Sequence, residues 1–191
     1  MESAPREAIA TERLRLEPAD SSHAEGLWVA VESSLDQLRP WLPWTETTSP
    51  EDLRSFLDRA VADWEGSRQW AFVITETQTR EPIGTVGLGN YDFLSGMASL
   101  GYWIRTARSG RGLMTEAASS VIRFGFDRLA LRRIELRAAP ENFASVRVAE
   151  KVGFKKEGLL RSAGRGAEPG LYHDHLIFGL LKDEASEARK I

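Results

Sequence analysis

Three strand-like segments follow one another in the middle of the chain, with only short turns between them. They cover Gln69–Thr75, Pro82–Tyr91 and Ala98–Arg105, and each is rich in β-branched or aromatic residues. The connecting segments Gln78–Glu81 and Leu94–Met97 suit hairpins, so the three strands are predicted to be antiparallel neighbours. This run of strands argues against a doubly wound sheet and an α/β barrel, because helices separate successive strands in both.

The segments on either side of this run alternate between helical and strand-like patterns. They predict one mixed, mostly antiparallel α/β domain with a central sheet of about seven strands and about four helices. We place the domain at residues 11–183, between a flexible lead-in over residues 1–10 and a polar tail over residues 184–191. Residues 38–50 and 162–170 are predicted loops. The other predicted strands are Arg13–Glu17, Arg133–Ala138, Lys155–Arg161 and Tyr172–Leu181, and the predicted helices start near Ser21, Pro50, Leu113 and Asn142.

The composition excludes several classes of function. The 191 residues carry a formal net charge of −3, which argues against broad nucleic-acid binding because that depends on an excess of Lys and Arg. The chain has no cysteine, so disulfides, thiolate metal sites and a cysteine nucleophile are excluded. No apolar run approaches the roughly 18 residues of a membrane span, and the first residues lack the pattern of a signal peptide. We therefore predict a cytoplasmic protein.

The sharpest local motif is the Gly-rich turn Ser109–Met114, between a predicted strand and the start of a long helix. Glycines let the backbone approach a ligand closely, and the helix start offers unpaired N–H groups and the positive end of the helix dipole. These features suit a pyrophosphate, to which Arg108 and Arg111 would add positive charge. A flexible structural turn is one alternative. A dinucleotide site is another, but Thr115 replaces the third glycine of its motif and antiparallel strands precede the turn.

Six blocks of sequence, in a fixed order, match a known family. They are TERLRLEP, LRPWLPW, PIGTVGL, LGYWIRTARSGRGLMTEA, RIELRAAPENFASVRVAEKVGFKKEG and YHDHLIFGLL. With these blocks the chain resembles the GNAT (GCN5-related N-acetyltransferase) superfamily, and most of all the branch with the Rim-type ribosomal-protein N-terminal acetyltransferases. The resemblance covers about residues 13–182, which is nearly the whole chain.

The resemblance implies a fold in which two parallel strands, Ala98–Arg105 and Arg133–Ala138, splay apart and admit acetyl-CoA as the cosubstrate. It implies backbone contacts with the pantetheine arm, turn amides that hold the pyrophosphate, and contacts at the start of the next helix. The pantetheine contacts would come from Trp103, Ile104 and Arg105. The pyrophosphate would be held by Ser109, Gly110, Arg111, Gly112, Leu113, Met114 and Thr115, and the helix-start contacts would come from Asn142 and Ser145. The family prefers Gln or Arg at the position of Ser109, and Arg108 is expected to substitute for that side chain.

Two side chains are the first candidates for the chemistry. Glu135 alternates with the apolar residues of its strand, and by resemblance it acts as a base through water; an ion pair with Arg133 or Arg137 is the alternative. By resemblance Ser145 lies near the cofactor sulfur and is the candidate acid for the thiolate, since the tyrosine that some relatives use is Ala149 here. A helix-start serine that bonds to its own backbone is the alternative for Ser145.

Tyr172 begins the last predicted strand and is a third catalytic candidate, unless it is an ordinary half-buried strand residue. His173 and His175 share one face of that strand, but no third ligand is apparent, so we predict no metal site.

Substrate-binding candidates lie in the Pro- and Trp-rich loop. Trp41 and Trp44 are expected to line the acceptor site, because prolines stiffen the loop that carries them; plugging one end of the core is the alternative. Glu46 is a candidate for attracting the positive charge of an amine.

By resemblance, the acceptor is the N-terminal α-amine of a protein or peptide. One alternative is acetylation of a small molecule, namely an amino acid, polyamine, aminoacyl-nucleotide or aminoglycoside. Another is an acyl-CoA-binding protein without turnover. The sequence does not decide the oligomeric state, and a homodimer that forms through the last strands is one possibility.

Overall fold

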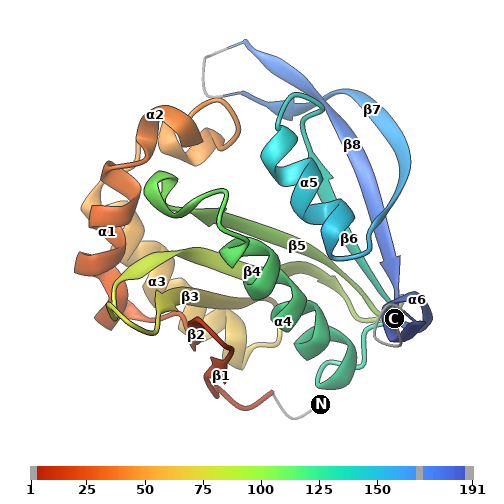
Figure 1. The fold of residues 1–191 in the computed structure, drawn as a ribbon, viewed down its shortest axis with the longest axis horizontal. Helices are drawn as coiled ribbons and strands as arrows, with labels where there is room; N and C mark the ends of the chain where they lie inside the picture. The colour runs from red at the N-terminus through yellow and green to blue at the C-terminus, as the bar shows by residue number, and fades with distance from the viewer. Residues whose placement is uncertain (1–3, 167–169, 188–191) are drawn as a thin grey trace.

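The computed structural model describes residues 4–166 and 170–187, and its central feature is one open sheet (Figure 1). Within the described residues the sheet has eight strands, in the order β1-β2-β3-β4-β5-β6-β8-β7. All neighbouring strands are antiparallel except β5 and β6, which are parallel. The strands are β1 (Ile9–Ala10), β2 (Leu14–Pro18), β3 (Trp70–Glu76), β4 (Pro82–Asp92), β5 (Met97–Ile104), β6 (Arg133–Ala138), β7 (Lys155–Arg165) and β8 (Tyr172–Leu181).

Helices cover both faces of this sheet. The helices α1 and α3 pack on one face, while α4 and α5 lie on the other (Figure 1). No helix in the described part of the chain is long and apolar enough to cross a membrane. The α-helices are α1 (Ala24–Glu32), α2 (Leu35–Leu38), α3 (Pro50–Glu65), α4 (Leu113–Asp127), α5 (Phe143–Lys151) and α6 (Lys182–Glu187), and short 3-10 helices cover Ser21–His23, Pro43–Thr45 and Thr106–Arg108.

The predicted run of hairpins is confirmed, because β3, β4 and β5 are consecutive antiparallel neighbours. Each connection contains a residue in the left-handed region that tight turns require. Arg80 has a φ of 59° in the first turn, and Gly96 has a φ of 63° in the second.

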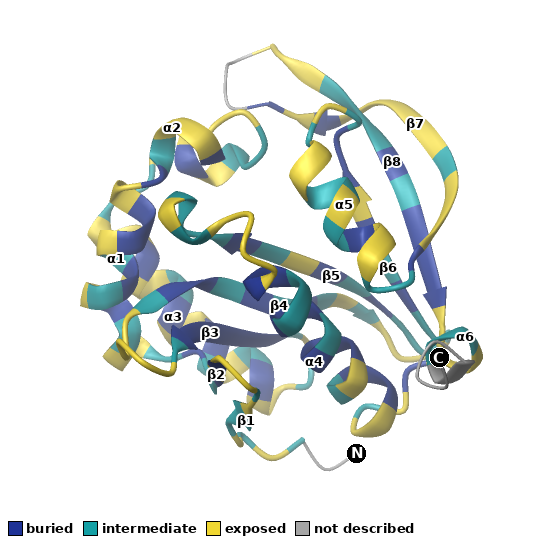
Figure 2. Cartoon of the chain, in the orientation of Figure 1, coloured by how far each residue is buried: buried dark blue, intermediate teal, exposed yellow. Residues whose placement is uncertain are grey.

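The strand β3 separates two hydrophobic cores. Trp70, Phe72 and Ile74 belong to the core that α4 covers, whereas Ala71 and Val73 belong to the core under α1 and α3. Successive side chains of a strand point to opposite faces, so a strand covered on both sides is buried along its length. Figure 2 shows β3 in dark blue, in contrast to the exposed edge strand β7.

The predicted splay of the parallel pair is confirmed. The strands β5 and β6 are in register only at Met97/Arg133, Ala98/Ile134 and Ser99/Glu135. Beyond these pairs β6 stays paired with β8 over its whole length, while β5 stays paired with β4. The two strands therefore diverge, as Figure 1 shows, and each has an unpaired edge facing the other.

The predicted mixed, mostly antiparallel α/β fold is confirmed, but the described part of the chain has eight strands instead of about seven and six α-helices instead of about four. The additional elements β1, α2 and α6 are too short to produce a periodic sequence pattern. The strand β7 also runs further than predicted, to Arg165, because Gly164 and Arg165 pair with β8. Residues 1–3 of the predicted lead-in, 167–169 of the predicted loop and 188–191 of the predicted tail lie outside the described residues, and the domain limits stay a prediction.

Candidate active site

The splay of β5 and β6 opens a cleft of about 660 Å³. Its walls come from the diverging halves of both strands, the Gly-rich turn and the first turns of α5. The loop before α3 and the first residues of β8 complete the lining. The residues that line the cleft include Trp41, Leu42, Leu100, Gly101, Tyr102, Trp103, Ile104, Arg108, Ser109, Gly110, Gly112, Leu113, Met114, Thr115, Arg137, Asn142, Ser145, His173 and His175.

The unpaired edge of β5 can accept an extended ligand as an added strand. The Arg105 N–H donates to the Ile83 carbonyl at 2.6 Å, so it points toward β4. Backbone groups alternate in direction along a strand, so Trp103 also faces β4 while Tyr102 and Ile104 face the cleft. Of the three predicted pantetheine positions, the structure therefore places Ile104 at the open edge. The backbone N–H and C=O groups of Trp103 and Arg105 point away from the cleft. Those of Tyr102, which was not predicted, point toward it.

The Gly-rich turn presents free backbone N–H groups at the start of α4. Gly110 and Gly112 have φ values of 74° and 78°, a left-handed backbone that favours glycine. Gly112 is the N-cap and has no side chain to cap the helix, so the amides of Leu113, Met114 and Thr115 have no partner within the helix. A Cβ at Gly110 would meet no atom within 4 Å, so the space beside the turn is open to a ligand.

The polar side chains just before the turn are engaged elsewhere. The Arg108 Nε donates to Glu76 at 3.0 Å, which holds this guanidinium against the end of β3. The Ser109 hydroxyl donates to the Thr106 carbonyl at 2.8 Å. Arg108 nevertheless lines the cleft, so its substitution for the family's side chain at Ser109 stays a prediction. The Arg111 side chain is exposed and does not line the cleft.

Glu116, in the first turn of α4, fastens the Gly-rich turn to the segment just before β2. Its carboxylate accepts hydrogen bonds from the Thr11 hydroxyl at 2.6 Å, the Arg13 N–H at 2.9 Å and the Arg13 Nε at 2.7 Å. The Arg13 Nη1 also donates to the Arg111 carbonyl at 3.0 Å. Burial opposes ionisation of Glu116, but the hydrogen bonds from Thr11 and Arg13 outweigh it and lower the pKa of this carboxyl.

Ser145 lies in the first turn of α5 and contacts a tyrosine from β5. The Asn142 side chain accepts the Ser145 N–H at 3.1 Å, so Asn142 is the N-cap of this helix. The Tyr102 hydroxyl lies 3.1 Å from Ser145 Oγ and 3.2 Å from the Ser145 carbonyl oxygen. Burial raises the pKa of Tyr102 to about 12, although the hydrogen bond to Ser145 opposes the rise. The phenol therefore stays protonated at neutral pH and can donate.

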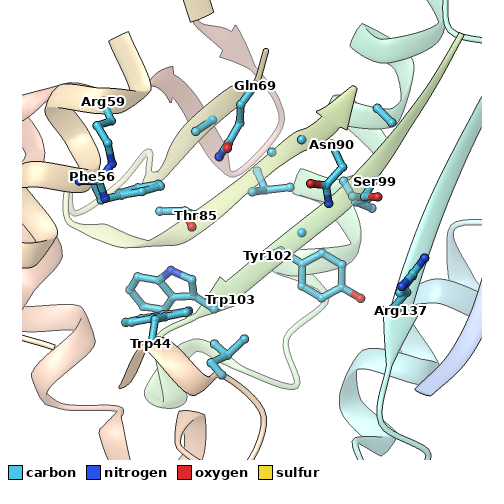
Figure 3. A pocket seen from close by; sticks show the side chains of 18 of the residues that line it. Trp44, Phe56, Arg59, Gln69, Thr85, Asn90, Ser99, Tyr102, Trp103 and Arg137 are labelled. Carbon is cyan, nitrogen blue, oxygen red and sulfur yellow. The ribbon is translucent and has the colours of Figure 1, made fainter. Parts of the chain in front are cut away.

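A second cavity of about 980 Å³ lies between the sheet and α3 (Figure 3). It shares Leu42, Leu100, Gly101, Tyr102, Trp103 and Arg137 with the cleft, so the two cavities meet where β5 and β6 diverge. The two cavities therefore adjoin along β5. We call the second cavity the acceptor pocket.

Glu135 lies where the pairing of β5 and β6 ends, in register with Ser99, and lines the acceptor pocket. Its Oε1 accepts a hydrogen bond from Arg133 at 3.0 Å, and its Oε2 lies 4.0 Å from Arg137. The ion pair considered as an alternative is thus present. The Oε2 atom is the one left for other contacts.

The structure separates the three predicted acceptor residues. Trp44 lines the acceptor pocket, with its ring centroid 6.0 Å from that of Trp103. Trp41 lines the cleft instead, 6.0 Å from the ring of His173. Glu46 lines neither cavity; its carboxylate accepts a hydrogen bond from Arg165 at 3.1 Å.

Tyr172 is 60% exposed and lines neither cavity, so the structure does not bring it to Ser145. Its neighbours His173 and His175 do line the cleft. Burial lowers the pKa of His175, and the charge of Arg137 adds to the effect. Among the described residues, no group of three or more His, Cys, Asp or Glu side chains is placed to hold a metal ion.

Sequence reasoning missed Tyr102 and Arg137, which both line the cleft and the acceptor pocket. Tyr102 stands next to Trp103 in a strand that was expected to contribute only backbone groups. The alternation of backbone direction along β5 would have placed Tyr102 at the open edge. Its contact with Ser145 has no local signal, because the two residues are 43 positions apart.

Comparisons with known proteins agree with this geometry. A family model for the acetyltransferase (GNAT) domain matches residues 13–155. An uncharacterized N-acetyltransferase, p20, of Bacillus licheniformis is 32% identical over 181 residues, which cover 93% of this chain and 98% of the relative. A ribosomal-protein-serine acetyltransferase of Escherichia coli is 26% identical over 154 residues, covering 80% of this chain and 85% of the relative.

Among solved structures, that of Mycobacterium smegmatis RimJ in complex with CoA-disulfide superposes with a TM-score of 0.86 at 25% identity. The match covers 98% of this chain and 95% of that one.

Proposed function

This chain belongs to the GNAT family of acetyltransferases, and we propose that, as an acetyl-CoA-dependent N-acetyltransferase, it modifies the N-terminal α-amine of a protein or peptide. The junction of the cleft with the acceptor pocket carries this proposal, because it lets a donor and an amine meet between β5 and β6. The acceptor class is supported by the E. coli relative, which acts on a ribosomal protein. The sequence resemblance to the Rim-type branch points the same way.

The residues of the cleft fit acetyl-CoA. The free amides that follow Gly112 suit the pyrophosphate, since a helix N-terminus without a side-chain cap attracts anions. The open edge at Tyr102 and Ile104 suits the amides of the pantetheine arm. The M. smegmatis neighbour was solved with a form of coenzyme A, which supports this assignment.

When bound, acetyl-CoA supplies an acetyl thioester for attack by the neutral amine. We propose that the Ser145 hydroxyl donates a proton to the departing thiolate as the C–S bond breaks, and that water in the cleft returns the proton released by the amine to Ser145. Tyr102, 3.1 Å from Ser145 Oγ, donates to that oxygen in turn and stabilises the serine oxygen as it gives up its proton. The Ile104 N–H faces the cleft and is the proposed donor to the oxyanion. Tyr172 lines neither cavity, so this proposal assigns it no step.

The amine must lose a proton before it attacks, and we propose that Glu135 accepts this proton through water at its Oε2. Replacing Glu135 by Gln should lower kcat and shift the pH–rate profile, with little change in acetyl-CoA affinity. Arg137→Gln, which leaves the carboxylate in place, is the comparison. Unchanged kinetics of the Glu135 variant would remove it as the base.

The first experiment is calorimetric titration of the protein with acetyl-CoA, with NAD as the control. We expect acetyl-CoA binding and no NAD binding. The acetyl-CoA-loaded protein is then offered N-terminal peptides, single amino acids, a polyamine and an aminoglycoside, and release of coenzyme A is measured. Turnover of peptides above all others supports the proposal, and preference for any small amine contradicts the acceptor class.

A further inference from the structure

One face of α3 forms a wall of the acceptor pocket. Asp52, Phe56 and Arg59 stand at i, i+4 and i+7 spacing, which places them on the same side of the helix, and all three line the pocket. Figure 3 shows Phe56 and Arg59 at the α3 side, well separated from Tyr102 and Arg137 at the junction with the cleft. The pocket therefore has a reactive end and an α3 end.

The two carboxylates in the wall of the pocket are already engaged. Asp52 accepts the Ser49 N–H at 3.0 Å and the Ser49 hydroxyl at 2.8 Å, as part of the capping box of α3. Glu135 is bound by Arg133 at 3.0 Å. Each carboxylate is therefore held by the protein through one of its oxygens, Asp52 through Oδ2 and Glu135 through Oε1.

The arginines in the same wall are less engaged. Arg59 has no hydrogen bond or ion pair with any residue in the described part of the chain. The only ionic partner of Arg137 there is Glu135, at the long distance of 4.0 Å. The pocket wall thus carries two carboxylates and two arginines, and Arg59, exposed at the α3 end, is the one of these four without a partner among the described residues.

Amide side chains add hydrogen-bond donors to this pocket. Asn90 has a φ of 49° at an irregularity in the pairing of β4 with β5, between Gly89 and Asp92. Such bulges re-aim side chains next to functional sites, and here the Asn90 amide lines the pocket (Figure 3). Gln69 lines it as well, and neither amide has a hydrogen-bond partner among the described residues.

We propose that the acceptor carries a negatively charged group at a distance from its reacting amine, and that Arg59 binds this group. A guanidinium pairs with a carboxylate or phosphate through two parallel hydrogen bonds, and Gln69 and Asn90 supply further donors in the pocket. The amine lies at the other end, beside Tyr102. A polyamine or aminoglycoside is disfavoured, because its additional positive charges would face Arg59 and Arg137. The inference rests on the proposed function and specifies its substrate.

Two classes of acceptor combine a reacting amine with a distant negative charge. One is a protein N-terminus with an acidic residue among its first positions, and the other is a small anionic amine. The test uses hexapeptides with an N-terminal alanine, neutral remaining residues and an amidated C-terminus. Asp is placed at position two, three or four, and matched peptides carry Asn or Lys there. Free aspartate and glutamate represent the small amines. Coenzyme A release gives kcat and KM for each.

We expect at least one Asp peptide to exceed its Asn counterpart by about tenfold in kcat/KM, mainly through KM, with the Lys peptide poorest. Arg59→Gln should remove this preference by raising KM for the Asp peptide. Arg59→Glu should reverse the preference in favour of Lys. Arg54→Gln is the matched control, because Arg54 is an exposed arginine of α3 that does not line the pocket.

Equal use of Asp and Asn peptides by the wild type, or a preference that survives Arg59→Gln, overturns the inference. If the wild type uses free aspartate or glutamate efficiently and Arg59→Gln does not, the inference is supported and the acceptor is a small anionic amine. If no amine is turned over, the proposed function fails. Titration of the coenzyme A-loaded protein with the same peptides then still shows whether Arg59 selects an anion.

Discussion

The Tyr102 hydroxyl connects the two sides of the cleft, since β5 carries it and α5 carries the serine that it contacts. A tyrosine with a pKa of about 12 is neutral over the whole physiological range, so this contact is between two hydroxyls, not between a phenolate and a donor. In the proposed mechanism this pair passes a proton toward the cleft without any charged residue.

If Ser145 and Tyr102 act together, their substitutions should not be additive. Ser145→Ala should lower kcat by about 10²-fold, the usual effect of losing acid–base help. Tyr102→Phe should cause a smaller loss and little change in acetyl-CoA affinity. Steady-state kinetics of the double variant should match Ser145→Ala alone. Losses that multiply would show that the two hydroxyls act independently, and full activity of Ser145→Ala would leave Ser145 with a helix-start role only.

At the scale of elements, the helix α4 combines an uncapped N-terminus with a separate fastening to the segment just before β2. The N-cap Gly112 leaves its first amides free, while Glu116 and Arg13 hold the turn in place. Ligand binding and anchoring therefore depend on different residues of the same segment.

The charge at the start of α4 can be tested without changing its shape. Gly112→Asp should abolish acetyl-CoA binding, because a carboxylate at this N-cap competes with the pyrophosphate for the free amides and repels it. Gly112→Asn is the matched neutral control, since asparagine tolerates the left-handed backbone at a φ of 78°. Calorimetry should show weakened acetyl-CoA binding by the Gly112→Asn variant and no binding by the Gly112→Asp variant. Equal affinities of the two variants would place the pyrophosphate elsewhere.

The fastening by Glu116 should appear as a pH-dependent contribution to stability. The pKa of Glu116 is lowered in the folded protein, so its contribution is present above the ordinary value of 4.5 and is lost as the pH falls through the lowered value. Glu116→Gln should reduce the free energy of unfolding by about 1–2 kcal/mol at pH 7.

Urea unfolding at pH 7 and at about pH 4 would measure this difference, which should shrink at the lower pH. Glu12→Gln is the control, because Glu12 is exposed and forms no hydrogen bond or ion pair with the described residues. An equal loss at both pH values would mean that packing, not the charged network, accounts for the effect.

At the scale of the whole molecule, the sheet has two parts that meet in one short parallel contact. The strands β1–β5 form one part and β6–β8 the other, and they are in register only from Met97/Arg133 to Ser99/Glu135. The shared core beneath α4 and α5 holds the parts together. The cleft is thus a property of the sheet topology and not of a mobile loop.

Acetyl-CoA should bridge the two parts of the sheet. Hydrogen exchange of the Tyr102, Ile104 and Leu113–Thr115 amides should slow markedly when it binds, because these groups gain partners in the cleft. The amides of β3, paired on both sides, should slow only through global stabilisation, which amounts to about 2.7 kcal/mol at a ligand concentration of 100 Kd. Unchanged exchange along β5 would contradict the proposed course of the pantetheine arm.

Patterns among neighbouring residues were sufficient to predict most of the fold. The run β3–β5, the start of α3 at Ser49 and the Gly-rich turn before α4 all depend on periodicity, turn chemistry or capping within a few residues. The family resemblance added the splay of β5 from β6, which no local pattern contains. The elements that the sequence did not predict, β1, α2 and α6, have two to six residues, which is too short for a recognisable hydrophobic period.

The sequence by itself determined which segments become strands and helices, because that choice is decided by residues close together in the chain. Tertiary structure alone decided which side chains meet. It joined Tyr102 to Ser145, separated Trp41 from Trp44, and paired Glu46 with Arg165 across 119 positions. It also left Arg59, in the acceptor pocket, without a partner among the residues that the structure describes. Such contacts depend on strand register and on the packing of distant elements, and no local pattern encodes either.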